Sequence, residues 1–340
     1  MAMNKLLGLL LGLTFAFNVM AEDIELNPSH PDRYAVVKGD TLWDISARFL
    51  KTPWRWPDIW QANEQIANPH LIYPGDVIEL SFVDGQPRLT LNRGNGKMSP
   101  SIRKSSLAEA IPMIPIDAIS AFLTKPRVMT QEEYDAAPYV VAFSDEHILG
   151  SAGIKAYVRT LDEGSSGGYS IVRQGEEYKD ATTGESLGFE SVFIADSTVE
   201  ATGDPGTVML SKSTREAGKG DRLLASEEGV VVQNFYPHAA ADDLKGHIIG
   251  VVDGVSQIGQ YNVVVVDRGL KDGVEVGHVF MVSHAGETIR DVIAGGDSEI
   301  TLPNEEAGTL MIFRAFDRVS YGLIMEAKRI MHRLDVIHAP

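Results

Sequence analysis

Short apolar runs separated by glycine, aspartate and proline dominate the chain from Ile111 onward. Strict alternation in Val319–Met325 places Val319, Tyr321, Leu323 and Met325 on one face of a strand. The runs recur every 8 to 15 residues or so, a spacing typical of small sandwiches or barrels rather than βαβ units. The predicted strands are Arg127–Met129, Tyr139–Phe143, Ile154–Arg159, Tyr169–Arg173, Ser191–Ile194, Val208–Leu210, Gly229–Val232, Ile248–Val252, Tyr261–Val266, Val279–Val282, Gly308–Arg314 and Val319–Met325.

A different pattern occupies Tyr34–Leu80. Tyr34–Lys38 predicts a short strand that ends at Gly39, and Thr41–Asp44 has the form of a capping box that opens a helix. Leu42, Ile45 and Phe49 then recur at helical spacing and predict one inward apolar stripe.

The same stretch continues with a second helix and closes with a strand. Pro57 suits the first turn of a helix, and Tyr73–Asp76 is a turn signal before the predicted strand Val77–Leu80. This order of strand, two helices and strand resembles a LysM module, which binds N-acetylglucosamine polymers such as peptidoglycan.

The resemblance implies a glycan groove between two loops. Backbone N–H and C=O groups there would pair with N-acetyl groups, while apolar side chains cover the sugar faces. At single residues, Asp40 and Thr41 are equally well interpreted as helix caps. The implied glycan-binding residues are Gly39, Asp40, Thr41, Leu42, Asn68, Pro69, Leu71, Ile72, Tyr73 and Pro74.

All four tryptophans, Trp43, Trp54, Trp56 and Trp60, fall in this stretch. A domain of about 50 residues needs large apolar side chains in its core, so some of them are expected to be buried. The insert Thr52–Trp60 is longer than a minimal helix-to-helix link, and its role is left open between a ligand wall and a protein contact.

The first residues predict export. Lys5 precedes an apolar run from Leu6 to Met20, and the small Ala21 favours cleavage before Glu22. The run is shorter than the roughly 20 residues that span hydrocarbon, which favours a signal peptide over an anchor. We therefore expect a cleavable signal peptide and a periplasmic, cell-wall-associated protein.

The predicted fold class is multidomain α+β, with a βααβ LysM module followed by two β-rich domains of sandwich or barrel type. Asp84–Ser106 is rich in Gly, Asn, Ser and basic residues and is typical of a linker. The expected parts are a signal peptide 1–21, a LysM domain 30–82, a linker 83–110, a β-rich domain 111–225 and a second β-rich domain 226–340.

Charge and composition limit the partners. The net charge of −17 argues against nucleic acid and anionic lipid, which require clustered Lys and Arg. The chain has no cysteine, so no disulfide supports its domains. No cofactor is expected, and the nine histidines show no paired spacing typical of a zinc site.

A wider resemblance concerns the later half. An N-terminal LysM before a β-rich half is similar to the TsaP family of type IV pilus secretin-associated proteins, whose C-terminal region resembles that of flagellar FlgT. The family implies a protein that ties the outer-membrane secretin to peptidoglycan, with a ring-like oligomer around the secretin as one arrangement. The segments that carry this likeness are Gly246–Val252, Gln260–Val265, Asp272–Phe280 and Arg318–Met325.

Two other functions stay open: a LysM-targeted wall hydrolase and a flagellar or other envelope accessory protein. Gly164–Gly168 formally satisfies the G-x-S-x-G pattern of a nucleophile elbow. No helix is predicted behind it, so a flexible hairpin loop is the better interpretation, and we predict no catalytic residue. Asp180–Gly188 and Lys271–Gly277 look loosely alike, either as two β-corners or as traces of duplication.

Overall fold

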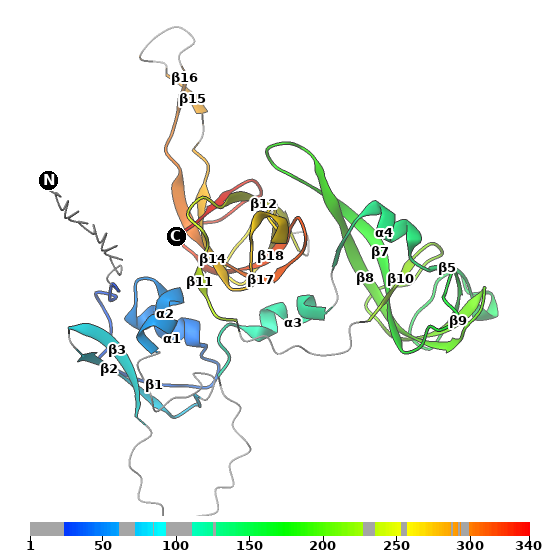
Figure 1. The fold of residues 1–340 in the computed structure, drawn as a ribbon, viewed down its shortest axis with the longest axis horizontal. Coiled ribbons are helices and arrows are strands. Elements are labelled where there is room, and N and C mark those ends of the chain that lie inside the picture. The colour runs from blue at the N-terminus through cyan, green and yellow to red at the C-terminus, as the bar shows by residue number, and fades with distance from the viewer. Residues whose placement is uncertain are drawn as a thin grey trace, which may run out of the picture.

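The computed structural model describes residues 24–60, 72–83, 85–92, 111–124, 127–226, 235–252, 257–286, 288–291, 293 and 299–340. The predicted signal peptide, most of the predicted linker and the predicted strand Gly229–Val232 lie outside these residues. A small N-terminal module is followed by two β-rich parts (Figure 1). Helices are few, and among the described residues none is both long and apolar enough to span a bilayer.

The N-terminal module has the βααβ order that the sequence predicts. Thr41 caps its first helix by accepting a hydrogen bond from the Asp44 amide, and Leu42, Ile45 and Phe49 are buried on the helix's inner face. Its elements are β1 (Arg33–Ala35), α1 (Leu42–Phe49), a 3-10 turn η1 (Pro53–Arg55), α2 (Trp56–Trp60), β2 (Val77–Val83) and β3 (Gln86–Asn92).

Strand β3 corrects the predicted linker, because residues 86–92 are regular structure rather than exposed loop. It pairs antiparallel with β2 along its whole length, and Leu89 lies fully buried opposite Leu80. Gly85 has a φ of +81°, as a tight hairpin turn requires. The dipeptide Asp84–Gly85 is a strong hairpin signal in the sequence, which the polar composition of the following residues obscured.

Two closed β-barrels make up the rest of the fold. The middle part contains α3 (Ile116–Thr124), β4 (Arg127–Met129), α4 (Gln131–Ala136), β5 (Tyr139–Phe143), η2 (Ser144–Glu146), β6 (Lys155–Arg159), β7 (Gly168–Lys179), β8 (Ser186–Ala201), β9 (Gly206–Ser213) and β10 (Arg222–Ala225). The C-terminal part contains β11 (His238–Ala239), β12 (Lys245–Val251), β13 (Val263–Val266), η3 (Leu270–Asp272), β14 (His278–His284), β15 (Thr288–Arg290), β16 (Glu299–Thr301), β17 (Glu305–Ala315), β18 (Ser320–Ala327) and β19 (Val336–His338).

The two barrels have the same strand order. The first closes as β5-β6-β9-β8-β7-β10, and the second as β12-β13-β18-β17-β14-β19, with every neighbouring pair antiparallel. Numbered along the chain, the strands of each ring neighbour one another as 1-2-5-4-3-6. Strands β4 and β11 attach outside the rings, to β8 and β14. The shared order supports a duplicated barrel, although Asp180–Gly188 and Lys271–Gly277 occupy different connections and are not equivalent.

One turn recurs in the module and in both barrels, and we call it the Gly–Asp turn. An aspartate amide donates to the carbonyl three residues earlier, and its carboxylate accepts from the amide of that same residue. The residue before the aspartate has positive φ, between +74° and +99°. Its occurrences are Val37–Asp40, Tyr73–Asp76, Gly218–Asp221 and, with leucine in the glycine position, His332–Asp335.

Several strands of the C-terminal barrel are buried on both of their faces. Val264, Val266 and Ile324 belong to the interior of the barrel, whereas Val263, Val265 and Leu323 belong to a second buried cluster on its outside. The predicted face of Val319, Tyr321, Leu323 and Met325 is therefore the outer one. That outer cluster is continuous with the core of the N-terminal module and with Ile119 of α3.

The hairpin β7–β8 of the middle barrel also contacts the C-terminal barrel. At its turn, the backbone amides of Thr183 and Thr182, together with Arg268 of the C-terminal barrel, hold the pKa of Asp180 at about 2. The distance between Arg268 Nη1 and Asp180 Oδ2 is 3.0 Å, and Arg318 pairs with Glu185 at 2.9 Å. Charged contacts thus join the two barrels at one hairpin.

The Gly–Asp turn gives a stability prediction. Gly220 has a φ of +92° and open space around the position of a Cβ, so Gly220→Ala adds backbone strain without a steric clash. We expect the free energy of unfolding to fall by about 1 kcal/mol. Gly164→Ala, which has equally open space and no positive φ, is the control and should leave it nearly unchanged. Urea unfolding followed by circular dichroism measures both, and equal effects would contradict the strained turn.

Candidate functional site

The residues expected to form the groove come from two loops of the N-terminal module. Gly39 is exposed, Asp40, Thr41 and Leu42 are buried, and Ile72 is fully buried. Tyr73 and Pro74 are half-buried. Asn68, Pro69 and Leu71 lie outside the described residues. The described members come together around the start of α1.

Asp40 has a structural role in this arrangement. Its carboxylate accepts a hydrogen bond of 2.8 Å from the Val37 amide and one of 3.0 Å from the Tyr34 hydroxyl. Burial and the neighbouring carboxylate of Asp40 raise the pKa of Tyr34. Asp40 therefore fixes the Gly–Asp turn that leads the chain into α1.

The first amides of α1 are all hydrogen-bonded, although no helical carbonyl is available to them. The Leu42 amide donates to the Pro112 carbonyl at 3.0 Å, and the Trp43 amide donates to the Met113 carbonyl at 3.1 Å. The Asp44 amide donates to Thr41 Oγ1 at 3.1 Å. Two of the three partners thus come from a segment about 70 residues away along the chain.

That segment also bonds to the opposite loop. The Ile111 amide donates to the Ile72 carbonyl at 2.8 Å. We call Ile111–Ile114 the covering segment; its Ile111, Met113 and Ile114 are 6%, 5% and 1% exposed. These residues lie at the start of the predicted middle domain, and nothing in their sequence pattern indicates contact with the N-terminal module.

The C-terminal barrel contacts the same end of α1. The Tyr261 hydroxyl donates to Asp44 Oδ1 at 3.1 Å. Burial, followed by the charge and hydrogen bond of Asp44, raises the pKa of Tyr261 to about 12. The ring of Tyr236 lies 6.4 Å from that of Trp56, centroid to centroid. The insert Thr52–Trp60 therefore makes an intramolecular contact.

The tryptophans of the module are largely core residues. Trp43, Trp56 and Trp60 are each less than 5% exposed, and Trp54 is half-buried. Only Trp54 thus keeps enough exposed surface in this conformation to stack on a sugar ring.

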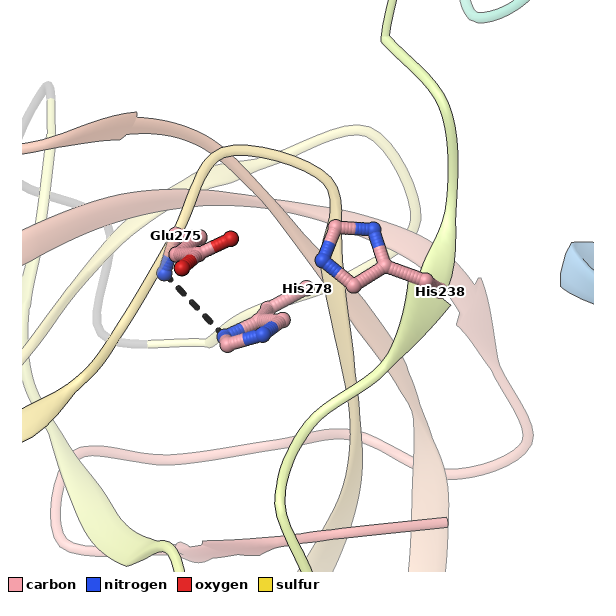
Figure 2. Close-up of side chains that lie close together, drawn as sticks. All are labelled: His238, Glu275 and His278. Atoms are coloured by element: carbon pink, nitrogen blue, oxygen red, sulfur yellow. Dashed lines mark hydrogen bonds between the residues drawn. The ribbon is translucent and has the colours of Figure 1, made fainter.

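Two clusters in the C-terminal barrel bring histidine and carboxylate side chains close enough to hold a metal ion. Figure 2 shows the first, in which His238 lies beside Glu275 and His278, a pair three residues apart in the sequence. The Glu275 amide donates to His278 Nδ1 at 3.1 Å, so this nitrogen is already occupied and Nε2 carries the proton in the neutral ring. Burial and nearby His238 lower the pKa of His278. The cluster is better explained as packing of His278 against the His238 ring.

The second cluster, His284, His332 and Asp335, has a structural counterpart in the middle barrel. His284 Nδ1 lies 2.7 Å from Asp335 Oδ1, and Arg173 Nε lies 2.7 Å from Asp221 Oδ1. Both aspartates belong to Gly–Asp turns that precede the last strand of a barrel. The pairing thus recurs where no histidine is present, which indicates barrel closure rather than metal binding.

The G-x-S-x-G segment does not form a nucleophile elbow in the structure. Gly164–Gly168 connects β6 to β7, which are not neighbours in the sheet, and β7 rather than a helix follows it. The expected hairpin is therefore wrong, because the loop crosses from one strand of the barrel to a non-adjacent one.

Comparison with known proteins agrees with the geometry of the N-terminal module. The LysM domain model matches residues 34–81. Over 62 residues the chain is 36% identical to the uncharacterized protein YqbP of Bacillus subtilis (strain 168). That match covers 15% of this chain and 28% of YqbP. The chain therefore carries a LysM domain, a non-catalytic module that binds peptidoglycan and related glycans and is consistent with association with the cell wall.

The contact between Tyr261 and Asp44 gives a prediction for alkaline pH. The folded-state pKa of Tyr261 lies near 12, above the ordinary value of 10.0, so the contact stabilises the fold fully below pH 10. This stabilisation is lost as pH rises through about 12, when a phenolate would face the Asp44 carboxylate. The melting temperature of the wild-type protein should exceed that of Tyr261→Phe at pH 9, and this difference should shrink at pH 11.5. A constant difference between the two proteins would contradict the contact.

Proposed function

We propose that this protein is a non-catalytic periplasmic protein that binds peptidoglycan through its LysM domain and holds the outer-membrane type IV pilus secretin to the cell wall. The observation that carries the first half is the LysM match at residues 34–81 together with the site at the start of α1. The secretin role rests on the resemblance of the later half.

The site has the chemistry that N-acetylated sugars require. The backbone amides of Leu42 and Trp43 would offer donors, and the Ile72 carbonyl an acceptor, once their hydrogen bonds to Ile111–Met113 are released. The apolar side chains of Leu42 and Ile72 suit the methyl groups and sugar faces. We propose Gly39, Asp40, Thr41, Leu42, Asn68, Pro69, Leu71, Ile72, Tyr73 and Pro74 as the glycan-binding residues, with Asp40 acting through the shape of its turn.

The C-terminal barrel, which follows the LysM module in the chain, also supports an anchoring role. The four segments that resemble the secretin-associated family form β12, β13, the connection into β14, and β18, all within the C-terminal barrel. A sugar-binding module joined to a folded protein-binding barrel can transmit force from a pore to the wall. A ring of such chains would increase the avidity of a weak glycan site. Export by the signal peptide 1–21 would deliver the chain to the periplasm.

Binding to peptidoglycan can be tested with purified sacculi. We expect the full mature chain to co-sediment with sacculi, to be displaced by N-acetylglucosamine tetramer, and to release no soluble muropeptides. Tyr73→Ala should weaken sedimentation about fivefold, because one half-buried aromatic wall of the groove is lost. Tyr157→Ala, at a surface position of the middle barrel, is the matched control and should bind normally. Failure of the mature chain to sediment would refute the glycan site, and muropeptide release would support a wall hydrolase.

Binding to the secretin can be tested by affinity capture from detergent-solubilised envelopes, with the full mature chain as bait. We expect the secretin among the retained proteins, and no flagellar basal-body component. Ile289 and Ile300 form an exposed cross-strand pair on β15–β16, the ribbon that projects from the C-terminal barrel (Figure 1). Ile289→Asp with Ile300→Asp should reduce capture, whereas Ile148→Asp, 82% exposed on the middle barrel, should not. Retention of flagellar components instead would favour the flagellar alternative.

A further inference from the structure

We infer that the covering segment Ile111–Ile114 is a built-in competitor of the glycan, so that the LysM domain binds peptidoglycan only after this segment leaves the groove. The inference rests on the proposed function and adds a regulatory step to it. It is carried by three backbone hydrogen bonds and by the burial of the segment's apolar side chains.

The covering segment offers the same functional group as the proposed ligand. An N-acetyl group is a secondary amide with one C=O and one N–H, and so is a peptide unit. The carbonyls of Pro112 and Met113 accept from the first two amides of α1, at 3.0 and 3.1 Å. The Ile111 amide donates to the Ile72 carbonyl at 2.8 Å. These are the groups of the two loops that the proposed function assigns to N-acetyl recognition.

The two ligands exclude each other. A backbone N–H has one hydrogen, so the Leu42 and Trp43 amides cannot bond fully to a glycan and to the covering segment at once. The segment also covers the apolar surface of the two loops, because Ile111, Met113 and Ile114 are buried in the same cluster as Leu42 and Ile72. A sugar would have to displace this apolar surface to reach the floor of the groove.

The covering segment is connected to the C-terminal barrel through α3. Arg314 of β17 donates from Nη1 to the carbonyls of Phe122 and Leu123, at 3.0 and 3.2 Å. These carbonyls belong to the last turn of α3, where a cation is favourable. In Figure 1, α3 lies below the C-terminal barrel, between the N-terminal module and the middle barrel. A partner that shifts the C-terminal barrel relative to α3 would thus pull on the covering segment.

Opening the groove should raise the apparent affinity, since binding is reduced by the fraction of molecules that are closed. Ile114→Asp places a carboxylate at a position that is 1% exposed and expels the segment. We expect this variant to bind sacculi about tenfold more tightly than the wild-type chain. Ile148→Asp makes the same chemical change at an exposed site and should bind like the wild type.

A second variant and a direct measurement do not depend on Ile114. Ile111→Pro removes the amide donor to Ile72 and part of the buried apolar side chain, and should tighten binding a few-fold. Hydrogen exchange on the wild-type chain should show slow exchange at the Leu42, Trp43 and Ile111 amides. Saturating N-acetylglucosamine tetramer should accelerate exchange at Ile111 alone, because the glycan replaces the segment on the first two amides.

The outcomes separate the two proposals. Equal sedimentation of wild type and a correctly folded Ile114→Asp would overturn competition and leave the glycan site intact. Absence of binding by both would overturn the glycan site and, with it, the regulatory step. If Ile114→Asp does not fold, Ile111→Pro replaces it in this comparison. An Ile111 amide that exchanges fast without glycan, or stays protected at saturation, would also overturn the inference.

Discussion

The arrangement of this protein depends on burial of both faces of one β-barrel wall. Side chains of β13, β17 and β18 fill the interior of the C-terminal barrel on one side and pack into a second cluster on the other. A strand with two apolar faces needs a cover on its outside, because apolar area of that size is costly to expose. The N-terminal module, the covering segment, α3 and the hairpin β7–β8 together provide that cover. The proposed glycan site at the start of α1 therefore takes its position from packing against the barrel.

Local patterns predicted the elements well and their contacts poorly. The capping box at Thr41, the apolar stripe of Leu42, Ile45 and Phe49, and most core strands followed from periodicity, which depends on a few neighbouring residues. Strands were predicted too short where they extend into polar hairpins, as in β7 and β8. Short strands such as β15 and β16 were missed, since three exposed residues give no alternation to detect.

The candidate site was predicted as two loops, without the segment Ile111–Ile114 that bonds to both of them. The N-terminal loop residues came from resemblance, and the structure places their described members together. The covering segment could not be found from the sequence, because Ile111–Ile114 has neither helical nor strand period. Its three hydrogen bonds all run through backbone groups, which carry no sequence signature. The likeness of the two barrels was hidden for a similar reason: strand order and Gly–Asp turns persist where Arg173 and His284 differ.

Under the proposed competition, the covering segment would also select which glycans hold the chain, according to their local concentration. A ligand on the same chain acts at an effective concentration in the millimolar range for a short tether. A free wall fragment displaces the segment only when the ratio of its concentration to its dissociation constant exceeds the same ratio for the segment. Glycan packed within a sacculus offers many adjacent sites to one groove and to its neighbours. The groove would then ignore fragments shed during wall turnover and respond to intact polymer, which makes its attachment a measure of local wall density.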